Sequence, residues 1–201
     1  MSVPATTTIN DRPPFQAHSP QTHADPSEPD ALALQIMLAR LYAHIAQATG
    51  TPAQLPPTLY LLDPDGRQHR VVMLNETALR IGGQLPFVGF FGRKRAWVDT
   101  DMLDALDAEL IEELRHNPHM LSYSSLELPD GSWGNLVIMG SPQGALDWAG
   151  SARHAHAAYT IAPACYLTIR LHSGVLILNG PAHGELQIRR TKHFDYAWGN
   201  C

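Results

Sequence analysis

The chain has 201 residues, of which 44% are hydrophobic and 16% are charged, and its formal net charge is −5. This composition supplies enough apolar side chains for a folded core, and its net negative charge argues against nucleic acid as a partner, which needs a positively charged face. Two distant cysteines, no signal-peptide pattern and no apolar run of roughly 20 residues predict a cytoplasmic protein without a membrane segment.

The N-terminal part of the sequence predicts a tail, a helix and a hairpin. Residues 1–30 contain six prolines and almost no large aliphatic side chains, which is typical of a flexible tail. Apolar residues then recur at three- and four-residue spacing after Asp30, which can cap a helix that Gly50 ends. Two apolar runs around a Pro-Asp-Gly turn predict a β-hairpin over residues 58–74. We interpret residues 31–85 as an extension of helix plus hairpin.

Residues 86–180 predict a domain with the element order β-α-β-β-α-β. The sequence indicates a strand at 86–92, a helix at 98–119, a hairpin at 120–140, a second helix at 141–159 and a strand at 165–178. This order predicts an α+β protein with a ferredoxin-like core, whose helices cover only one face of the sheet. A second subunit, giving a homodimer, or the N-terminal helix would cover the other face. Residues 181–201 predict an additional strand or arm.

The segment "GALDWAGSARHAHAAY" carries two histidines, His154 and His156, only two residues apart. Residues at this spacing point about 200° apart on a helix, so both cannot face one site. Helical periodicity places His156 on the same apolar face as Trp148 and Tyr159, and places His154 on the outer face.

The same segment resembles the dimeric α+β barrel superfamily, which includes antibiotic-biosynthesis-type monooxygenases, bacterial heme-degrading monooxygenases and the heme-binding chlorite dismutases. The motif of the heme-degrading branch is a strand followed by Ser, a hydrophobic residue and Asp-Trp-x-x-Ser. In this sequence the matching residues are Ser141, Leu146, Asp147, Trp148 and Ser151.

The resemblance implies a heme pocket bordered by Trp148, with a histidine of the same helix as the iron ligand. The ligand position of the heme-degrading branch is Ala158 here, whereas His154 lies one helical turn earlier on the same side. The resemblance therefore favours His154 as the metal ligand and the periodicity favours His156, and an axial heme ligand needs only one neutral imidazole.

Strand residues supply the other candidate site groups. Alternation puts Trp133 and Asn135 on one face of their strand, and puts Tyr166 and Arg170 on one face of the last core strand. We expect Trp148, Asn135 and Tyr166 to position a substrate or oxygen, and Trp133 and Arg170 to help bind the cofactor, with Arg170 pairing a propionate or carboxylate. A solvent-facing Arg170 is the alternative.

These patterns predict a monooxygenase-type oxidoreductase of secondary metabolism that acts on a small hydrophobic or aromatic molecule. It would bind heme through His154 or His156, or use no cofactor and a histidine as general base. The alternative function is a non-catalytic ligand-binding or dimerisation module of the same fold. A metal-dependent lyase or hydrolase that uses His154 with His116 or His119 is a third hypothesis.

Overall fold

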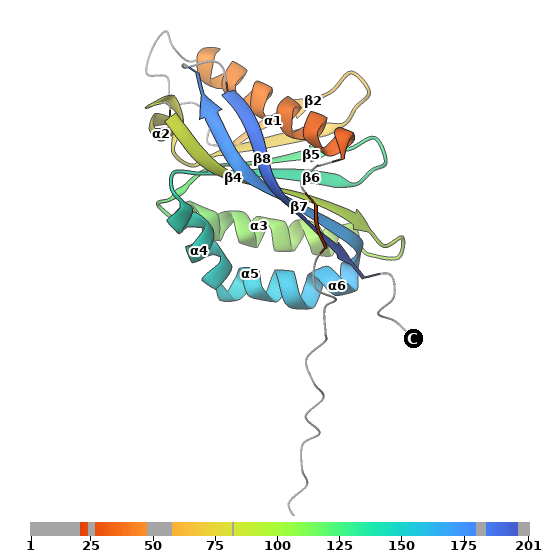
Figure 1. Ribbon diagram of the computed structural model, residues 1–201. Coiled ribbons are helices and arrows are strands. Elements are labelled where there is room, and N and C mark those ends of the chain that lie inside the picture. Colours follow the sequence, from red (N-terminus) through yellow and green to blue (C-terminus); the bar gives the residue numbers. More distant parts are fainter. Residues whose placement is uncertain (1–20, 24–26, 48–57, 82, 180–183, 197–201) are drawn as a thin grey trace, which may run out of the picture.

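The computed structural model describes residues 21–23, 27–47, 58–81, 83–179 and 184–196. Within these ranges the chain forms one antiparallel sheet with helices on both sides (Figure 1). The α+β class predicted from the sequence is confirmed. None of the helices in these ranges has the length and apolar character needed to cross a membrane.

The sheet has eight strands in the order β1-β8-β7-β4-β6-β5-β3-β2, and every neighbouring pair is antiparallel. The strands are β1 (Gln21–His23), β2 (Thr58–Leu62), β3 (Gln68–Met73), β4 (Gly83–Lys94), β5 (Met120–Glu127), β6 (Trp133–Met139), β7 (Tyr166–Leu178) and β8 (Gly184–Asp195).

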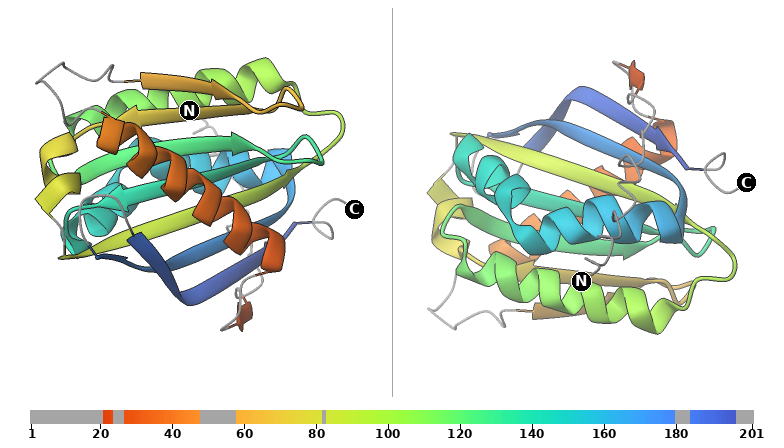
Figure 2. Two further views of the ribbon diagram at one scale, coloured as in Figure 1. Left: turned by 90° about the horizontal axis from the view of Figure 1, so that it is seen from above. Right: turned by 90° about the horizontal axis from the view of Figure 1, so that it is seen from below.

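Helices form a layer on each side of the sheet (Figure 2). One long helix lies on the first side, which we call the α1 side, and α3 to α6 lie on the opposite side, which we call the α3 side. The helices are α1 (Glu28–Gln47), α2 (Glu76–Ile81), α3 (Thr100–His116), α4 (Pro142–Gly150), α5 (Ala152–His156), the π-helical turn η1 (Ala157–Ile161) and α6 (Ala162–Cys165).

The larger hydrophobic core lies on the α1 side. Leu34, Leu41 and Ile45, spaced to fall on one face of α1, are fully buried against β4 and β6 side chains such as Phe87 and Ile138. Burying apolar surface on this scale is the main favourable term in folding, at roughly 25 cal/mol per Å². The α1 layer therefore covers the sheet face that the four core strands leave open.

The four strands of the predicted core domain are adjacent in the order β7-β4-β6-β5. α3 connects β4 to β5, and α4 to α6 connect β6 to β7, with both connections on the α3 side. The sequence left two possibilities for covering the other side, a second subunit or the N-terminal helix. In the structure the N-terminal helix lies there.

The structure differs from the sequence-based expectation at three elements. α1 begins at Glu28 and not after Asp30, whose carboxylate contacts the sheet and does not cap the helix. Residues 21–23, expected in a flexible tail, pair with β8 as β1, and the rest of that tail before Ser27 is outside the described residues. The short helix α2 was not predicted. The hairpin over β2 and β3, with Gly66 at φ +83° in its turn, is confirmed.

Candidate functional site

The second predicted helix of the core domain is interrupted at Ser151. α4 ends at Gly150, and Ser151 has extended backbone angles of φ −66° and ψ 131°. The Ser151 hydroxyl accepts a hydrogen bond from the backbone N–H of His154 at 3.0 Å, so Ser151 is the N-cap of α5. Ser141, the first residue of the predicted helix, stands at the N-cap of α4, but its hydroxyl bonds to His119 Nδ1 at 3.1 Å and caps no backbone N–H.

This interruption reverses the predicted orientation of the two histidines. One continuous helix would turn His156 towards the sheet together with Trp148. In the structure His156 is exposed and His154 is half-buried, because the break at Ser151 changes the rotation of α5 relative to α4. The orientation predicted from helical periodicity is therefore wrong, and His154 is the histidine that faces the protein.

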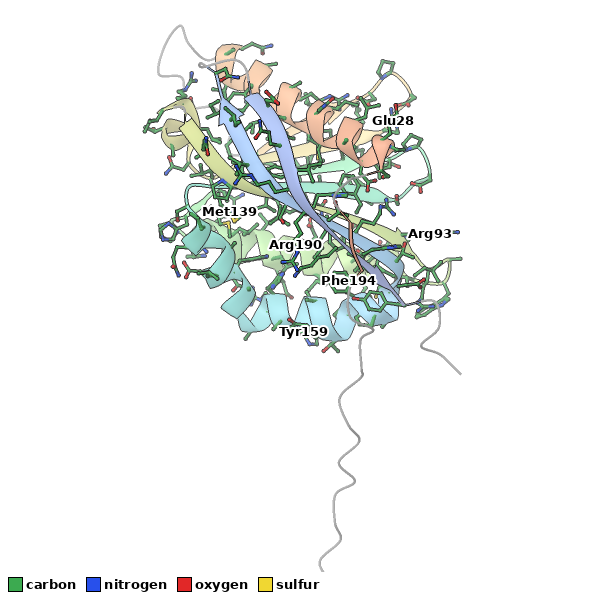
Figure 3. All side chains as sticks on the ribbon, in the orientation of Figure 1. Glu28, Arg93, Met139, Tyr159, Arg190 and Phe194 are labelled. Carbon is green, nitrogen blue, oxygen red and sulfur yellow. The ribbon has the colours of Figure 1, made fainter. Side chains whose placement is uncertain are left out.

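Trp148 and His154 form an aromatic pair across the break. Their ring centroids are 5.0 Å apart and the rings are tilted by 46°. Burial lowers the pKa of His154 from its ordinary value of 6.5, although the carboxylate of Glu113 acts in the opposite direction. The imidazole is therefore neutral at pH 7. Trp148 also packs against the smaller core on the α3 side, which includes Met139, labelled beside α4 in Figure 3.

A pocket of about 310 Å³ opens beside Trp148, between the C-terminal end of α3 and α4. It contains two carboxylates, those of Glu113 and Asp147, and neither lysine nor arginine is among its lining residues in the described part of the chain. Glu113 Oε2 is buried without a hydrogen-bond partner there, and Nε of Arg153 is 3.9 Å away. The pocket is lined by Glu113, His116, Asn117, Pro118, Asp147, Trp148 and Ser151.

Metal-ligating side chains do not converge in the described part of the chain. No group of three or more His, Cys, Asp or Glu side chains there could hold a metal ion. The Nδ1–H group of His116 donates to the Glu112 carbonyl oxygen at 2.8 Å, and His119 contacts Ser141. The two histidines predicted as alternative metal ligands are thus engaged locally, at the end of α3 and in the loop that follows it.

The predicted strand residues divide between the two sides of the sheet. Trp133 and Asn135 alternate with buried Leu136 of the α1 side, so they lie on the α3 side, as the sequence predicts. Asn135 Oδ1 is buried and has no hydrogen-bond partner among the described residues. Neither residue lines the pocket beside Trp148.

Tyr166 and Arg170 lie on opposite sides of the sheet, which corrects the expectation that they share a face. The pairing of β4 with β7 shifts by one residue between Thr168 and Tyr166, and such a bulge reverses the alternation. Tyr166 consequently packs edge-on against Phe90, with ring centroids 5.6 Å apart. Burial raises the pKa of Tyr166 to about 12.

A second tyrosine on the α3 side belongs to a charged cluster. The Tyr123 hydroxyl donates to Asp107, whose other oxygen accepts from Arg70. Burial, and secondarily Asp107, raise the pKa of Tyr123 well above its ordinary value. Asp107 of α3 thus accepts hydrogen bonds from Arg70 of β3 and from Tyr123 of β5, and these bonds connect α3 to both strands.

Arg170 faces the α1 side and pairs with a residue that the sequence did not connect with it. Its Nε and Nη2 donate to the Asp30 carboxylate at 2.6 and 2.9 Å. His172 lies 2.9 Å from Asp30 through Nε2 and 2.9 Å from the Thr191 hydroxyl through Nδ1. Arg170 is therefore held by Asp30 on the α1 side, with its side chain 32% exposed, and is not available to a ligand on the α3 side.

The Asp30 network is a buried electrostatic contact between α1 and the sheet. Burial alone would raise the pKa of Asp30, but hydrogen bonds from His172 and Arg170 and the charge of Arg170 together lower it to about 2. Asp30, His172 and Thr191 are all buried. The sequence did contain one signal of this network, because Arg170 and His172 are polar residues at alternate positions of a central strand. No sequence pattern identifies Asp30, 140 residues before Arg170, as their partner.

Comparison with protein-family models, with curated proteins and with solved structures finds no match to this chain.

Proposed function

We propose that this protein binds a small organic cation with an aromatic group in the pocket beside Trp148. This is the ligand-binding alternative that the sequence offered. The single observation that carries it is the combination, in one pocket, of an indole and two carboxylates, with no lysine or arginine among the described residues that line it. A cation gains from the face of an indole about 0.5–2 kcal/mol, and an ammonium group can also donate to a carboxylate.

Three features of the pocket favour a cation over a neutral or anionic ligand. Glu113 has a buried oxygen without a hydrogen-bond partner in the described residues, which an ammonium donor would satisfy. Asp147 is exposed at the same rim. His154, whose ring contacts the indole, adds no positive charge because its pKa is lowered by burial.

The size of the pocket favours a small molecule. Ligand pockets range over about 300–1,000 Å³, and this pocket, at about 310 Å³, is at the lower end. Trp148 and Pro118 offer apolar surface for a ring, and Ser151 offers a hydroxyl for a polar substituent.

The residues around His154 suit heme less well. The imidazole lies against Trp148, and the carboxylates of Glu113 and Asp147 would repel heme propionates. Arg170, expected to pair with a propionate, is bound to Asp30 on the opposite side of the sheet. Heme binding and monooxygenase activity stay predictions of the family resemblance, and they are tested by the same experiment as the cation site.

The fold proposal is a ferredoxin-like core formed by β4, α3, β5, β6, α4 to α6 and β7, supported by the strand order β7-β4-β6-β5. A homodimer remains part of the proposal. Since α1 packs on the face that a dimeric barrel would use, its interface must lie elsewhere on the molecule.

The experiment compares three probes that share a phenyl ring and differ in charge: phenethylamine, 2-phenylethanol and phenylacetate. Binding is followed by the NMR shift of the Trp148 indole N–H, assigned by its loss in Trp148→Phe. We expect phenethylamine alone to shift this signal, and we expect Glu113→Gln to weaken its binding by about tenfold, or about 1.4 kcal/mol.

The matched control is Glu109→Gln, an exposed carboxylate on the same helix that also pairs with Arg153 and does not line the pocket. This variant should bind phenethylamine like the natural protein. Equal binding of the alcohol or the carboxylate would contradict the proposal. A hemin titration that gives a sharp Soret band, lost in His154→Ala, would replace the proposal by the heme prediction.

A further inference from the structure

The two outer strands of the sheet are protected to very different degrees. β8 carries the charged residues Arg189, Arg190 and Lys192, its pairing with β7 contains a bulge, and β1 covers part of its outer edge. β2 has the sequence Thr-Leu-Tyr-Leu-Leu and pairs with β3 at every residue without a bulge. Natural proteins usually blunt a free edge with charges, proline or bulges. β2 has none of these.

Among the described residues, the backbone groups on the outer edge of β2 have no partner at alternate residues. The Asp63 N–H donates to the Arg67 carbonyl oxygen at 2.9 Å, within the same hairpin. Hydrogen bonds in an antiparallel pair alternate along each strand, so Leu61 and Leu59 bond to β3, and Thr58, Tyr60 and Leu62 direct their N–H and C=O groups outward. No described strand pairs with this edge. β2 can therefore accept a further antiparallel strand.

The side chains beside this edge are apolar and exposed. Tyr60 is 71% exposed and Leu62 is 74% exposed, and both lie on the α3 side, as their register with Arg70 and Gln68 requires. Exposed apolar side chains next to unpaired backbone groups are typical of a surface on which another strand adds.

We infer that β2 is a dimerisation edge, and that the strand which adds to it is β2 of a second copy of this chain. The strand is suited to pair with itself, because Tyr60 is its central residue. A two-fold axis at Tyr60 pairs the outward groups of Tyr60 with those of Tyr60 in the second copy, and pairs Thr58 with Leu62. The exposed Tyr60 and Leu62 side chains then pack across the strands on one face.

The charge distribution of α3 complements this arrangement. Arg115 donates to the Thr58 hydroxyl at 3.4 Å, and Asp107 pairs with Arg70, the neighbour of Tyr60, so α3 runs opposite to β2. Figure 2 shows α3 alongside β2 at the rim of the sheet. The two-fold axis therefore brings the last turn of one α3, with Arg115, towards the first turns of the other, which carry the exposed Asp101 and Asp104. Opposite charges and antiparallel helix dipoles then face each other.

This inference does not depend on the proposed ligand, and its first test is the mass of the full chain in solution. Light scattering during size-exclusion chromatography should give twice the 22.1 kDa of one chain. Tyr60→Lys and Leu62→Lys should each weaken dimerisation by at least about tenfold, since a charge on a pairing edge must be desolvated. A monomer at every concentration would overturn the inference and leave the edge open to a strand of another protein.

Two matched variants control for a general effect of new charges. Tyr159→Lys is the control for Tyr60→Lys, because Tyr159 is 80% exposed on η1, where it is labelled in Figure 3. Ile81→Lys is the control for Leu62→Lys, because Ile81 is an exposed aliphatic residue on α2. Both should dimerise like the natural protein. A dimer that persists in Tyr60→Lys and Leu62→Lys would place the interface elsewhere and overturn the inference.

A cysteine at the axis tests the register directly. Directly opposed residues of a hydrogen-bonded antiparallel pair have Cα atoms about 5.5 Å apart, within the about 4.4–6.8 Å range of disulfides. Tyr60→Cys, in a Cys201→Ser background because Cys165 is buried, should form a covalent dimer under mild oxidation. Tyr159→Cys in the same background should remain monomeric on a denaturing gel. Equal cross-linking of the two variants would overturn the inference.

Discussion

The α1 side and the α3 side of the sheet are built by different means. On the α1 side one helix of 20 residues buries Leu34, Met37 and Leu41 completely and carries a buried carboxylate that bonds to the sheet. On the α3 side the second connection is broken into short segments, and α5 buries no residue. A continuous amphipathic helix can follow a sheet and exclude water, whereas a broken one leaves space at its break. The pocket beside Trp148 opens at such a break.

This difference places the larger buried core on the α1 side, and the pocket in which we propose that a ligand binds on the α3 side. Substitutions that remove buried apolar surface or one partner of a buried ion pair lower the free energy of unfolding by several kcal/mol. Half-exposed side chains at a helix end can contact a ligand without loss of the fold. Substitutions on the α1 side should accordingly affect unfolding much more than substitutions around the pocket.

The largest effect is expected for Asp30→Ala. It removes the carboxylate from between Arg170 and His172 and leaves a guanidinium without its buried partner, which should lower the free energy of unfolding by about 3–5 kcal/mol. Chemical denaturation measures this change. Asp65→Ala is the control, because Asp65 pairs with Arg67 at the exposed turn of the β2–β3 hairpin, where solvent screens the ion pair.

The Asp30 network also predicts a pH dependence with a defined sign. The pKa of Asp30 is lowered from 3.8 to about 2, so the stability that this carboxylate contributes is present above pH 3.8 and is lost as the pH falls towards 2. The shift corresponds to about 2 kcal/mol. Asp30→Ala should lack this part of the acid unfolding. An unchanged acid transition would show that the network does not hold α1 to the sheet.

His69, on the α1 side of β3, should produce a second acid effect at higher pH. Burial, and secondarily the charge of Arg40, lower its pKa from 6.5 to about 4 although Asp63 opposes this. Between pH 6.5 and pH 4 the unfolded chain binds more protons than the folded chain does. The free energy of unfolding therefore has its full value above pH 6.5 and falls by about 3 kcal/mol as the pH decreases to 4. Urea denaturation across this range measures the change.

His69→Phe should remove most of that dependence and preserve stability at pH 7. Neither ring nitrogen of His69 has a hydrogen-bond partner among the described residues, so an apolar ring of similar size loses no polar contact there. His154, whose pKa burial also lowers, accounts for a smaller part in the same direction. His116→Ala, at an exposed histidine of α3, should leave the acid dependence in place. A dependence equally strong in His69→Phe would assign it to the α3 side.

The elements with an uninterrupted pattern could be predicted from the sequence. Residues 31–50 predicted α1 from the spacing of Leu34, Leu41 and Ile45, and the Pro-Asp-Gly turns predicted both hairpins, because these signals are local. The N-cap of α3 is Asp99, whose side chain accepts from the Asp101 N–H. Local capping and turn geometry depends on few residues, so single-sequence reasoning identifies it.

The predictions of side-chain orientation failed where a single residue changes which face of a helix or strand the neighbouring residues occupy. Ser151 satisfies the backbone of α5 and interrupts the helix, so the orientation calculated from Trp148 no longer applied to His156. The bulge before Thr168 separated Tyr166 from Arg170 in the same way. Asp30 fits a helix cap as well as a buried counter-ion, and only the fold decides between these roles. Of the residues in the candidate site, the sequence therefore pointed to Trp148 and His154 but not to Glu113.

The smallest expected effect is at the break itself, where Ser151→Ala removes the hydroxyl that accepts from the His154 N–H. Loss of such a cap lowers the free energy of unfolding by about 1 kcal/mol, and it should also move the Trp148 fluorescence, because the two rings are in contact across the break. Ser141→Ala is the control, since Ser141 caps no backbone N–H of α4, and it should leave that fluorescence unchanged. If Ser151→Ala destabilised the protein as much as Asp30→Ala, the break would be as important to the fold as the α1 contact. The pocket could then no longer be regarded as separate from the part of the molecule that maintains its stability.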